Sequence, residues 1–221
     1  MHGGPWSIRI APAVAVVAAV VGTSLAVASP ALAGAGWGGD RGWFVTLSVL
    51  GDFVDADDPA AGGDGGFFVD EWAPGAMFGV GHAFTPAFAI KLTAANAPHG
   101  TSVEGVEVNH ASAALEAHVR FYPGERAQAY LFGGFGGATL DADDHGVRSE
   151  VRGGLMVLGA GFLYHLSSHL ALDIGGRVDV IDWNEAEVTF TGGGSGEITV
   201  GGPVAESGSA GKLLLGLVWS F

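Results

Sequence analysis

The stretch that decides the fold lies near the middle of the chain and reads His110-Ala111-Ser112-Ala113-Ala114-Leu115-Glu116-Ala117-His118-Val119-Arg120-Phe121-Tyr122. Its odd positions are apolar: Ala111, Ala113, Leu115, Ala117, Val119 and Phe121. Its even positions include the polar residues Ser112, Glu116, His118 and Arg120. Successive side chains of a β-strand point to opposite faces, so a period of two is typical of a strand. The stretch therefore predicts a strand with one apolar and one polar face.

The same alternation recurs along the chain and predicts eight strands of about 9–14 residues. They cover residues 43–53, 75–84, 87–95, 110–122, 127–140, 153–166, 169–182 and 211–221. The segments 127–140 and 153–166 are glycine-rich and apolar on both faces, so their register stays open. Short turns at 85–86, 123–126 and 167–168 alternate with long polar stretches at 54–74, 96–108, 141–152 and 183–210, which we expect to be loops. Residues 188–191 and 197–200 read as a hairpin in the last loop. They are too short for two more membrane strands, so a ten-stranded barrel is disfavoured.

Composition narrows the class of protein. The 9 Lys and Arg residues face 23 Asp and Glu residues, for a net charge of −14. This charge argues against a nucleic-acid partner, because nucleic-acid affinity comes largely from neutralised phosphates. The absence of cysteine excludes disulfides and thiolate metal sites. Hydrophobic residues make up 48% of the chain and charged residues only 14%, which is about half the usual charged share.

Alternating strands suit either a soluble β-sandwich or a transmembrane β-barrel, and the polar faces distinguish the two. Here the polar faces hold mostly small residues and few charges, as the narrow interior of an eight-stranded barrel requires. The charges come in balanced sets, which predicts a polar network of paired side chains in the lumen. The predicted network comprises Lys91, Glu116, His118, Arg120, Asp173, Arg177 and Asp179. Aromatic residues near segment ends are expected at the two membrane interfaces: Trp43, Phe84, Phe121, Tyr122, Trp183, Trp219 and Phe221.

Residues 1–33 are typical of a cleaved secretory signal peptide. Arg9 precedes an apolar stretch, and Ala31-Leu32-Ala33 fits the small-x-small cleavage pattern. An uncleaved N-terminal membrane anchor is the alternative. The predicted organisation is then a signal peptide at 1–33, a short segment at 34–41 and an all-β domain at 42–221.

The C-terminal residues Gly216-Leu217-Val218-Trp219-Ser220-Phe221 carry the most specific pattern, a glycine, an aromatic residue and a final phenylalanine. With residues 159–172, which look like a penultimate hairpin, they give the chain a resemblance to the small outer-membrane β-barrels of Gram-negative bacteria (the OmpA transmembrane-domain, OmpX and OmpW-like group). The pattern departs at Leu214, where a polar residue is usual. The resemblance implies an eight-stranded antiparallel up-and-down transmembrane β-barrel in the outer membrane. It also implies that Gly216, Trp219 and Phe221 form a signal read by the barrel-assembly machinery, and that outer-membrane lipid and lipopolysaccharide surround the barrel.

The expected function is a structural or surface-interaction role through acidic extracellular loops, whose ligand the sequence does not identify. A passive channel for a small or apolar solute is the alternative that an OmpW-like resemblance implies, and an enzyme that modifies lipid A is a distant third. No catalytic residue, cofactor or metal site is predicted. Ser167, Ser168 and His169 read as a polar turn, since a Ser–His pair needs an oriented acidic partner. His82 and His118 have no second metal ligand at a suitable spacing.

Overall fold

The computed structural model describes residues 42–54, 72–101, 106–144, 147–192 and 196–221, and the predicted signal peptide and the segment 34–41 lie outside these residues. Eight strands follow one another, and they are β1 (Gly42–Val54), β2 (Trp72–Thr85), β3 (Phe88–Gly100), β4 (Glu107–Arg120), β5 (Ala127–Asp144), β6 (Val147–His165), β7 (Leu170–Gly192) and β8 (Gly196–Ser220). Within the described part of the chain, no helix has the length and apolar character needed to cross a membrane.

Each strand pairs antiparallel with the next, and β8 pairs with β1 to close a barrel. The closing seam runs from Phe44 opposite Ser220 to Val54 opposite Ala210. The backbone N–H of Phe221 extends it by donating to the carbonyl of Trp43 at 3.0 Å. Closure removes open strand edges, which a strand in lipid cannot tolerate. The prediction of an eight-stranded antiparallel up-and-down barrel is confirmed, and residues 188–192 belong to β7 and residues 196–200 to β8.

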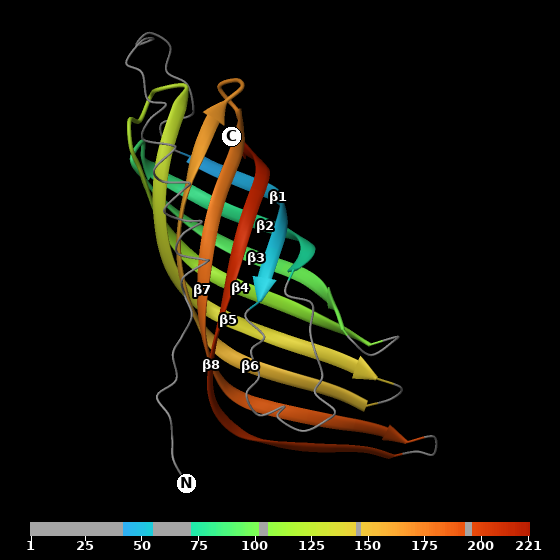
Figure 1. Ribbon diagram of the computed structural model, residues 1–221. Helices are drawn as coiled ribbons and strands as arrows, with labels where there is room; N and C mark the ends of the chain where they lie inside the picture. The colour runs from blue at the N-terminus through green and yellow to red at the C-terminus, as the bar shows by residue number, and fades with distance from the viewer. Residues whose placement is uncertain (1–41, 55–71, 102–105, 145–146, 193–195) are drawn as a thin grey trace.

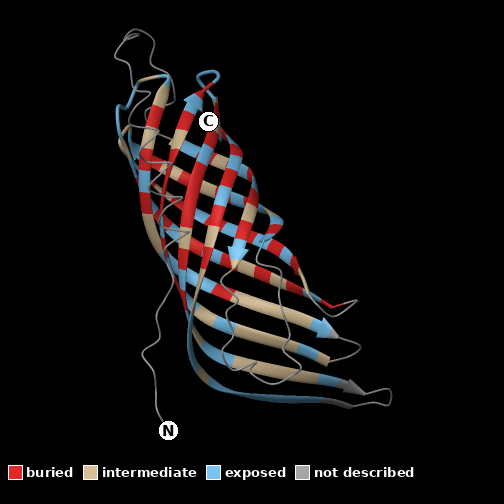
Figure 2. Cartoon of the chain, viewed as in Figure 1, coloured by how far each residue is buried: buried red, intermediate tan, exposed pale blue. Residues whose placement is uncertain are grey.

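The two faces of the wall follow the predicted alternation, visible in Figure 2 as buried and exposed residues in turn along the parts of the strands that close the barrel. On β4 the side chains of Ser112, Glu116 and His118 are buried in the lumen, whereas Leu115 and Val119 point outward and are exposed. The outward face is a broad apolar band that includes Leu47, Val49, Phe78, Leu92, Leu131, Phe135, Met156, Leu158, Ile174, Leu215 and Leu217. An apolar outer surface of this extent is a surface for lipid.

The glycine-rich wall of β5 and β6 offers a matched pair of predictions. Gly136 and Gly154 lie on facing strands, and both are exposed. A Cβ on Gly136 would overlap the carbonyl oxygen of Ala113, whereas a Cβ on Gly154 would have no heavy atom within 4 Å. We expect Gly136→Ala to lower the free energy of unfolding by about 1–3 kcal/mol through overpacking against backbone. Gly154→Ala is expected to be neutral or slightly stabilising. Urea unfolding of the two refolded variants measures the difference, and equal effects would contradict the close packing of β4 against β5.

Two expectations are corrected by the long strands. The stretches 141–152 and 183–210 were expected to be loops, but they are mostly strand, so β5 to β8 contain 18, 19, 23 and 25 residues. The strands β1 to β4 contain only 13 or 14 residues. As a result β5 to β8 run past the others as a curved sheet at the end opposite the C-terminus (Figure 1). Trp183, expected at a membrane interface, instead packs against the buried lumen cluster.

Candidate functional site

The lumen holds a continuous chain of ion pairs in which acids and bases alternate. In order, its members are Asp52, Lys212, Asp179, Arg177, Glu116 and Lys91. Lys212 Nζ lies 3.5 Å from Asp52 Oδ1 and 2.5 Å from Asp179 Oδ2. Arg177 donates from Nε to Asp179 at 2.5 Å and from Nη1 to Glu116 at 2.9 Å. Lys91 Nζ completes the chain 3.4 Å from Glu116.

All six of these side chains are buried, none more than 5% exposed. Moving an ion out of water costs several kcal/mol, and close pairing with the opposite charge offsets that cost. The members come from β1, β3, β4, β7 and β8, so the chain of ion pairs crosses the lumen and joins opposite walls. It makes the interior a filled, electrostatically balanced core.

An aromatic layer lies beside this chain. The His118 ring stacks on Phe132 with centroids 4.8 Å apart, and its Nε2 lies 2.9 Å from Glu116 Oε2. Tyr130 donates its hydroxyl to Asp173 at 2.6 Å. The guanidinium of Arg120 lies 5.6 Å from the centroid of Phe44. Rings and charges together fill this level of the lumen.

A second level of the lumen is apolar and explains the departure at Leu214. The buried cluster consists of Leu50, Ala73, Met77, Ala95, Ala97 and Leu214. Leu214 therefore faces inward, as the position requires, but meets methyl groups and a thioether in place of polar partners. Leucine at this position adds apolar packing to the interior.

The structure buries Lys91, Glu116, His118, Asp173, Arg177 and Asp179 in the lumen and leaves Arg120 half-buried. The sequence did not predict that Asp52, Lys212 and Tyr130 belong to the polar network of the lumen. Asp52 and Lys212 share the strand parity of the buried residues Ser48 and Gly216, and this parity was the signal that could have found them. The predicted assembly residue Gly216 lies at the seam, where a Cβ would overlap Ser48 Oγ.

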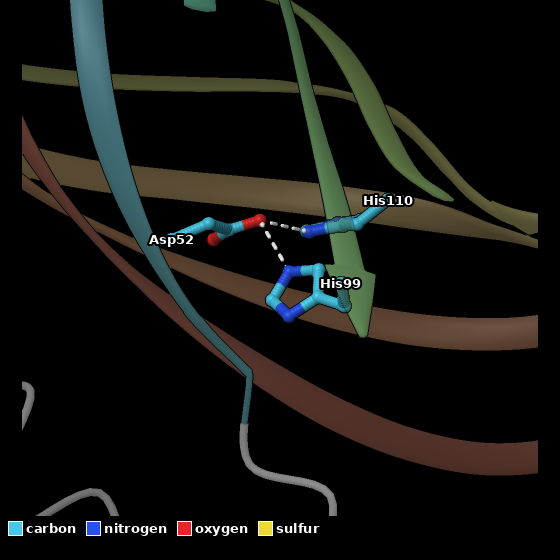
Figure 3. A group of neighbouring side chains, drawn as sticks. All are labelled: Asp52, His99 and His110. Atoms are coloured by element: carbon cyan, nitrogen blue, oxygen red, sulfur yellow. Dashed lines mark hydrogen bonds and ion pairs between the residues drawn. The ribbon is translucent and has the colours of Figure 1, made fainter. Parts of the chain in front are cut away.

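A second group shares Asp52 with the chain of ion pairs and lies where β1 and β3 end and β4 begins, at the end of the barrel opposite the C-terminus. Asp52, His99 and His110 offer ligand atoms that all lie within 4.8 Å of one another. The Oδ2 atom of Asp52 lies 2.6 Å from His110 Nδ1 and 3.4 Å from His99 Nε2. Figure 3 shows both imidazoles pointing at this one carboxylate. Sequence reasoning missed the group because the strand predicted at 87–95 ended before His99.

The turn at Ser167 has a structural role. Ser167 Oγ accepts hydrogen bonds from the backbone N–H groups of His169 and Leu170 at 3.3 and 3.1 Å. His169 Nδ1 lies 3.1 Å from the carbonyl oxygen of Ser220, within hydrogen-bonding distance. These contacts fix the β6–β7 turn against the end of β8.

Beyond the barrel wall, the sheet formed by β5 to β8 has one charged face. Directly paired residues share a face, so Arg148 lies with Thr189 and Thr199, and Glu150 lies with Glu187. Arg148 reaches Asp141 at 3.1 Å, and a hydrogen bond from Arg152 lowers the pKa of Glu150 below its usual value. Both arginines are largely exposed, so solvent screens each pair and the pairs add little to stability.

The other face of this sheet is apolar. Val147, Phe190 and Ile198 form one cross-strand row, and Val188 and Val200 lie in the next. In β6, Val147 shares its parity with Leu155, which is buried in the lumen. The apolar face therefore continues the inward side of the barrel. Within the closed barrel the inward face carries the charges, whereas on the sheet beyond it the outward face carries them.

A closed barrel with an apolar exterior and a charged, filled interior defines an integral membrane β-barrel. The chain belongs to the outer membrane protein beta-barrel domain family, whose profile matches residues 13–221. A comparison with curated proteins found no match.

Solved structures share the fold at low identity. Neisserial surface protein A has a TM-score of 0.56 and 12% identity over 81% of this chain and 97% of its own. A major outer membrane protein from Thermus thermophilus has a TM-score of 0.59 and 11% identity over 81% and 99%. The attachment invasion locus protein Ail of Yersinia pestis, solved with the heparin analogue sucrose octasulfate, has a TM-score of 0.53 and 13% identity over 83% and 100%.

Proposed function

We propose that this protein is a surface-interaction barrel whose filled lumen anchors it in the membrane. Its binding element outside the cell is the part of β5 to β8 that runs past the other strands, called here the extension. The difference in strand length carries the proposal. A membrane strand needs about 9–11 residues, and β7 and β8 have 23 and 25. The surplus projects on the order of 40 Å beyond the wall at about 3.3 Å per residue.

The extension offers two features that suit a polypeptide partner. Its apolar face carries exposed Phe190, Ile198 and Val200. Among the described residues, its outermost strand, β8, also has an open edge, because β1 pairs with β8 only as far as Ala210. In the described part of the chain, β8 before that residue pairs with β7 alone. An open edge beside an apolar face accepts an extended segment as an added strand.

Charge selects the chemistry of that segment. The chain has a net charge of −14, and Asp182, Glu185 and Glu206 are exposed on the extension. An acidic surface attracts basic partners and repels sulfated ones. Although Ail was solved with a heparin analogue, the expected partner here is an extended peptide that combines apolar and basic residues.

Selection from a random peptide library on the refolded barrel tests the proposal. We expect enriched peptides to combine apolar and basic residues. They should lose binding to the variant Phe190→Ser/Ile198→Ser/Val200→Ser, because it removes the apolar face. A control variant on the opposite face, Thr189→Ala/Thr199→Ala, should still bind the enriched peptides. Heat-modifiable migration on gels verifies that both variants fold. Absence of enrichment, or equal binding by both variants, would overturn the proposal.

Planar-bilayer recording distinguishes this role from a passive channel. Arg177 and Glu116 are fully buried and tie β4 to β7 across the lumen, so we expect a silent barrel with no stepwise conductance. Stepwise conductance by the refolded protein would favour the channel. A transported apolar solute that leaves sideways into lipid is tested separately, by uptake into vesicles that contain the barrel.

A further inference from the structure

The cluster of Asp52, His99 and His110 has the composition of a metal site. We propose that these three residues bind a divalent transition-metal ion at the end of the lumen opposite the C-terminus. Zn²⁺ is the expected ion. Two imidazole nitrogens and a carboxylate oxygen suit zinc and its neighbours, whereas Ca²⁺ and Mg²⁺ prefer oxygen ligands alone. The proposal is independent of the surface-interaction role.

The geometry needs only a small adjustment. The three ligand atoms lie within 4.8 Å of one another, and zinc lies about 2.0–2.2 Å from each nitrogen or oxygen that binds it. The contacts of Asp52 Oδ2 to His110 at 2.6 Å and to His99 at 3.4 Å show that both rings already converge on the carboxylate. An ion placed between the three would replace the proton that a hydrogen bond at this position requires.

The three side chains are buried, and one oxygen of Asp52 has room for a closer partner. The side chains of Asp52, His99 and His110 are at most 1% exposed. Asp52 Oδ1 accepts no hydrogen bond among the described residues, which leaves a buried carboxylate oxygen available as a second ligand atom. A carboxylate bound through both oxygens would give this atom a closer partner than Lys212 Nζ, which lies 3.5 Å away.

Lys212 is the positive charge that opposes a cation here, since its Nζ lies 3.5 Å from Asp52 Oδ1. The same ammonium lies closer to Asp179, at 2.5 Å. Asp179 can therefore hold Lys212 when Asp52 turns to the ion, and the ion pairs from Lys212 to Lys91 stay in place. A bound ion would tie β1 to the β3–β4 hairpin near the mouth of the barrel.

Isothermal titration of the refolded, tag-free barrel with Zn²⁺ tests the site. We expect one ion per chain, with binding at least about tenfold weaker in His99→Ala/His110→Ala. His82→Ala is the control, because His82 lies on the outward face between Trp43 and Phe84. Zn²⁺ should also raise the urea midpoint of the wild type and of the control, but not of the double variant.

A spectroscopic measurement on the wild type keeps the test independent of how the variants fold. X-ray absorption at the zinc edge should show nitrogen and oxygen ligands near about 2.0 Å with scattering from two imidazoles. Failure of the wild type to bind Zn²⁺ at a defined stoichiometry, equal binding by a folded double variant, or a spectrum without imidazole would each overturn the proposal.

Discussion

Replacing Arg177 with methionine is expected to lower the free energy of unfolding of the barrel by about 3–5 kcal/mol. Arg177 is 2% exposed and donates to both Glu116 and Asp179. Its removal leaves two buried carboxylates without their shared cation, and the methionine fills the space without supplying charge. Urea unfolding in lipid vesicles, followed by tryptophan fluorescence, measures the loss.

Arg148→Met is the matched control. Arg148 also contacts two acids, Asp141 and Glu150, but its side chain is 60% exposed. Solvent screens these pairs, so the expected loss is only a small fraction of the loss in Arg177→Met. Similar losses in the two variants would show that the lumen charges are hydrated and would contradict a filled interior.

The second large effect is expected on the outward face. Leu158→Arg places a charge in the apolar band, where we expect a loss of about 2–4 kcal/mol near the bilayer midplane. Val200→Arg is the control, because Leu158 and Val200 are equally exposed, at 64% and 61%, but Val200 lies on the extension. The proposed function places the extension in water, so the control should change the free energy of unfolding by less than about 0.5 kcal/mol.

The comparison uses the same refolded barrels and the same urea titration. A loss at Val200 as large as that at Leu158 would mean that lipid covers the extension as well. If neither substitution lowers the free energy of unfolding, the outward apolar band does not face lipid.

Much of the fold was accessible from sequence because barrel strands obey a period of two. The parity of Glu116 and His118 against Leu115 and Val119 predicted which side chains face inward. Acids and bases on the inward side could then be expected to pair, since a narrow interior has little water to solvate them. Arg177 on β7 pairs with Glu116 on β4, and this contact between strands that are not neighbours in the sheet follows from closure of the barrel.

The rest depended on geometry that parity does not contain. Glycines at 192–194, 196 and 201–202, together with nearby acids, read as loop composition, yet cross-strand contacts such as Phe190 with Ile198 keep β7 and β8 paired. The contact of Asp52 with His99 and His110 joins residues 47 and 58 positions apart. Their meeting depends on strand tilt and stagger, which single-sequence patterns do not reveal.

Cysteine labelling on intact cells tests the central claim, that β5 to β8 carry a binding sheet outside the cell. The chain has no cysteine, so each single substitution gives one reactive site. The account predicts that a membrane-impermeant maleimide labels Ile198→Cys on intact cells, whereas Ser168→Cys, in the short turn at the opposite end, reacts only after the outer membrane is permeabilised. Labelling of Ser168→Cys on intact cells while Ile198→Cys stays unreactive would contradict it.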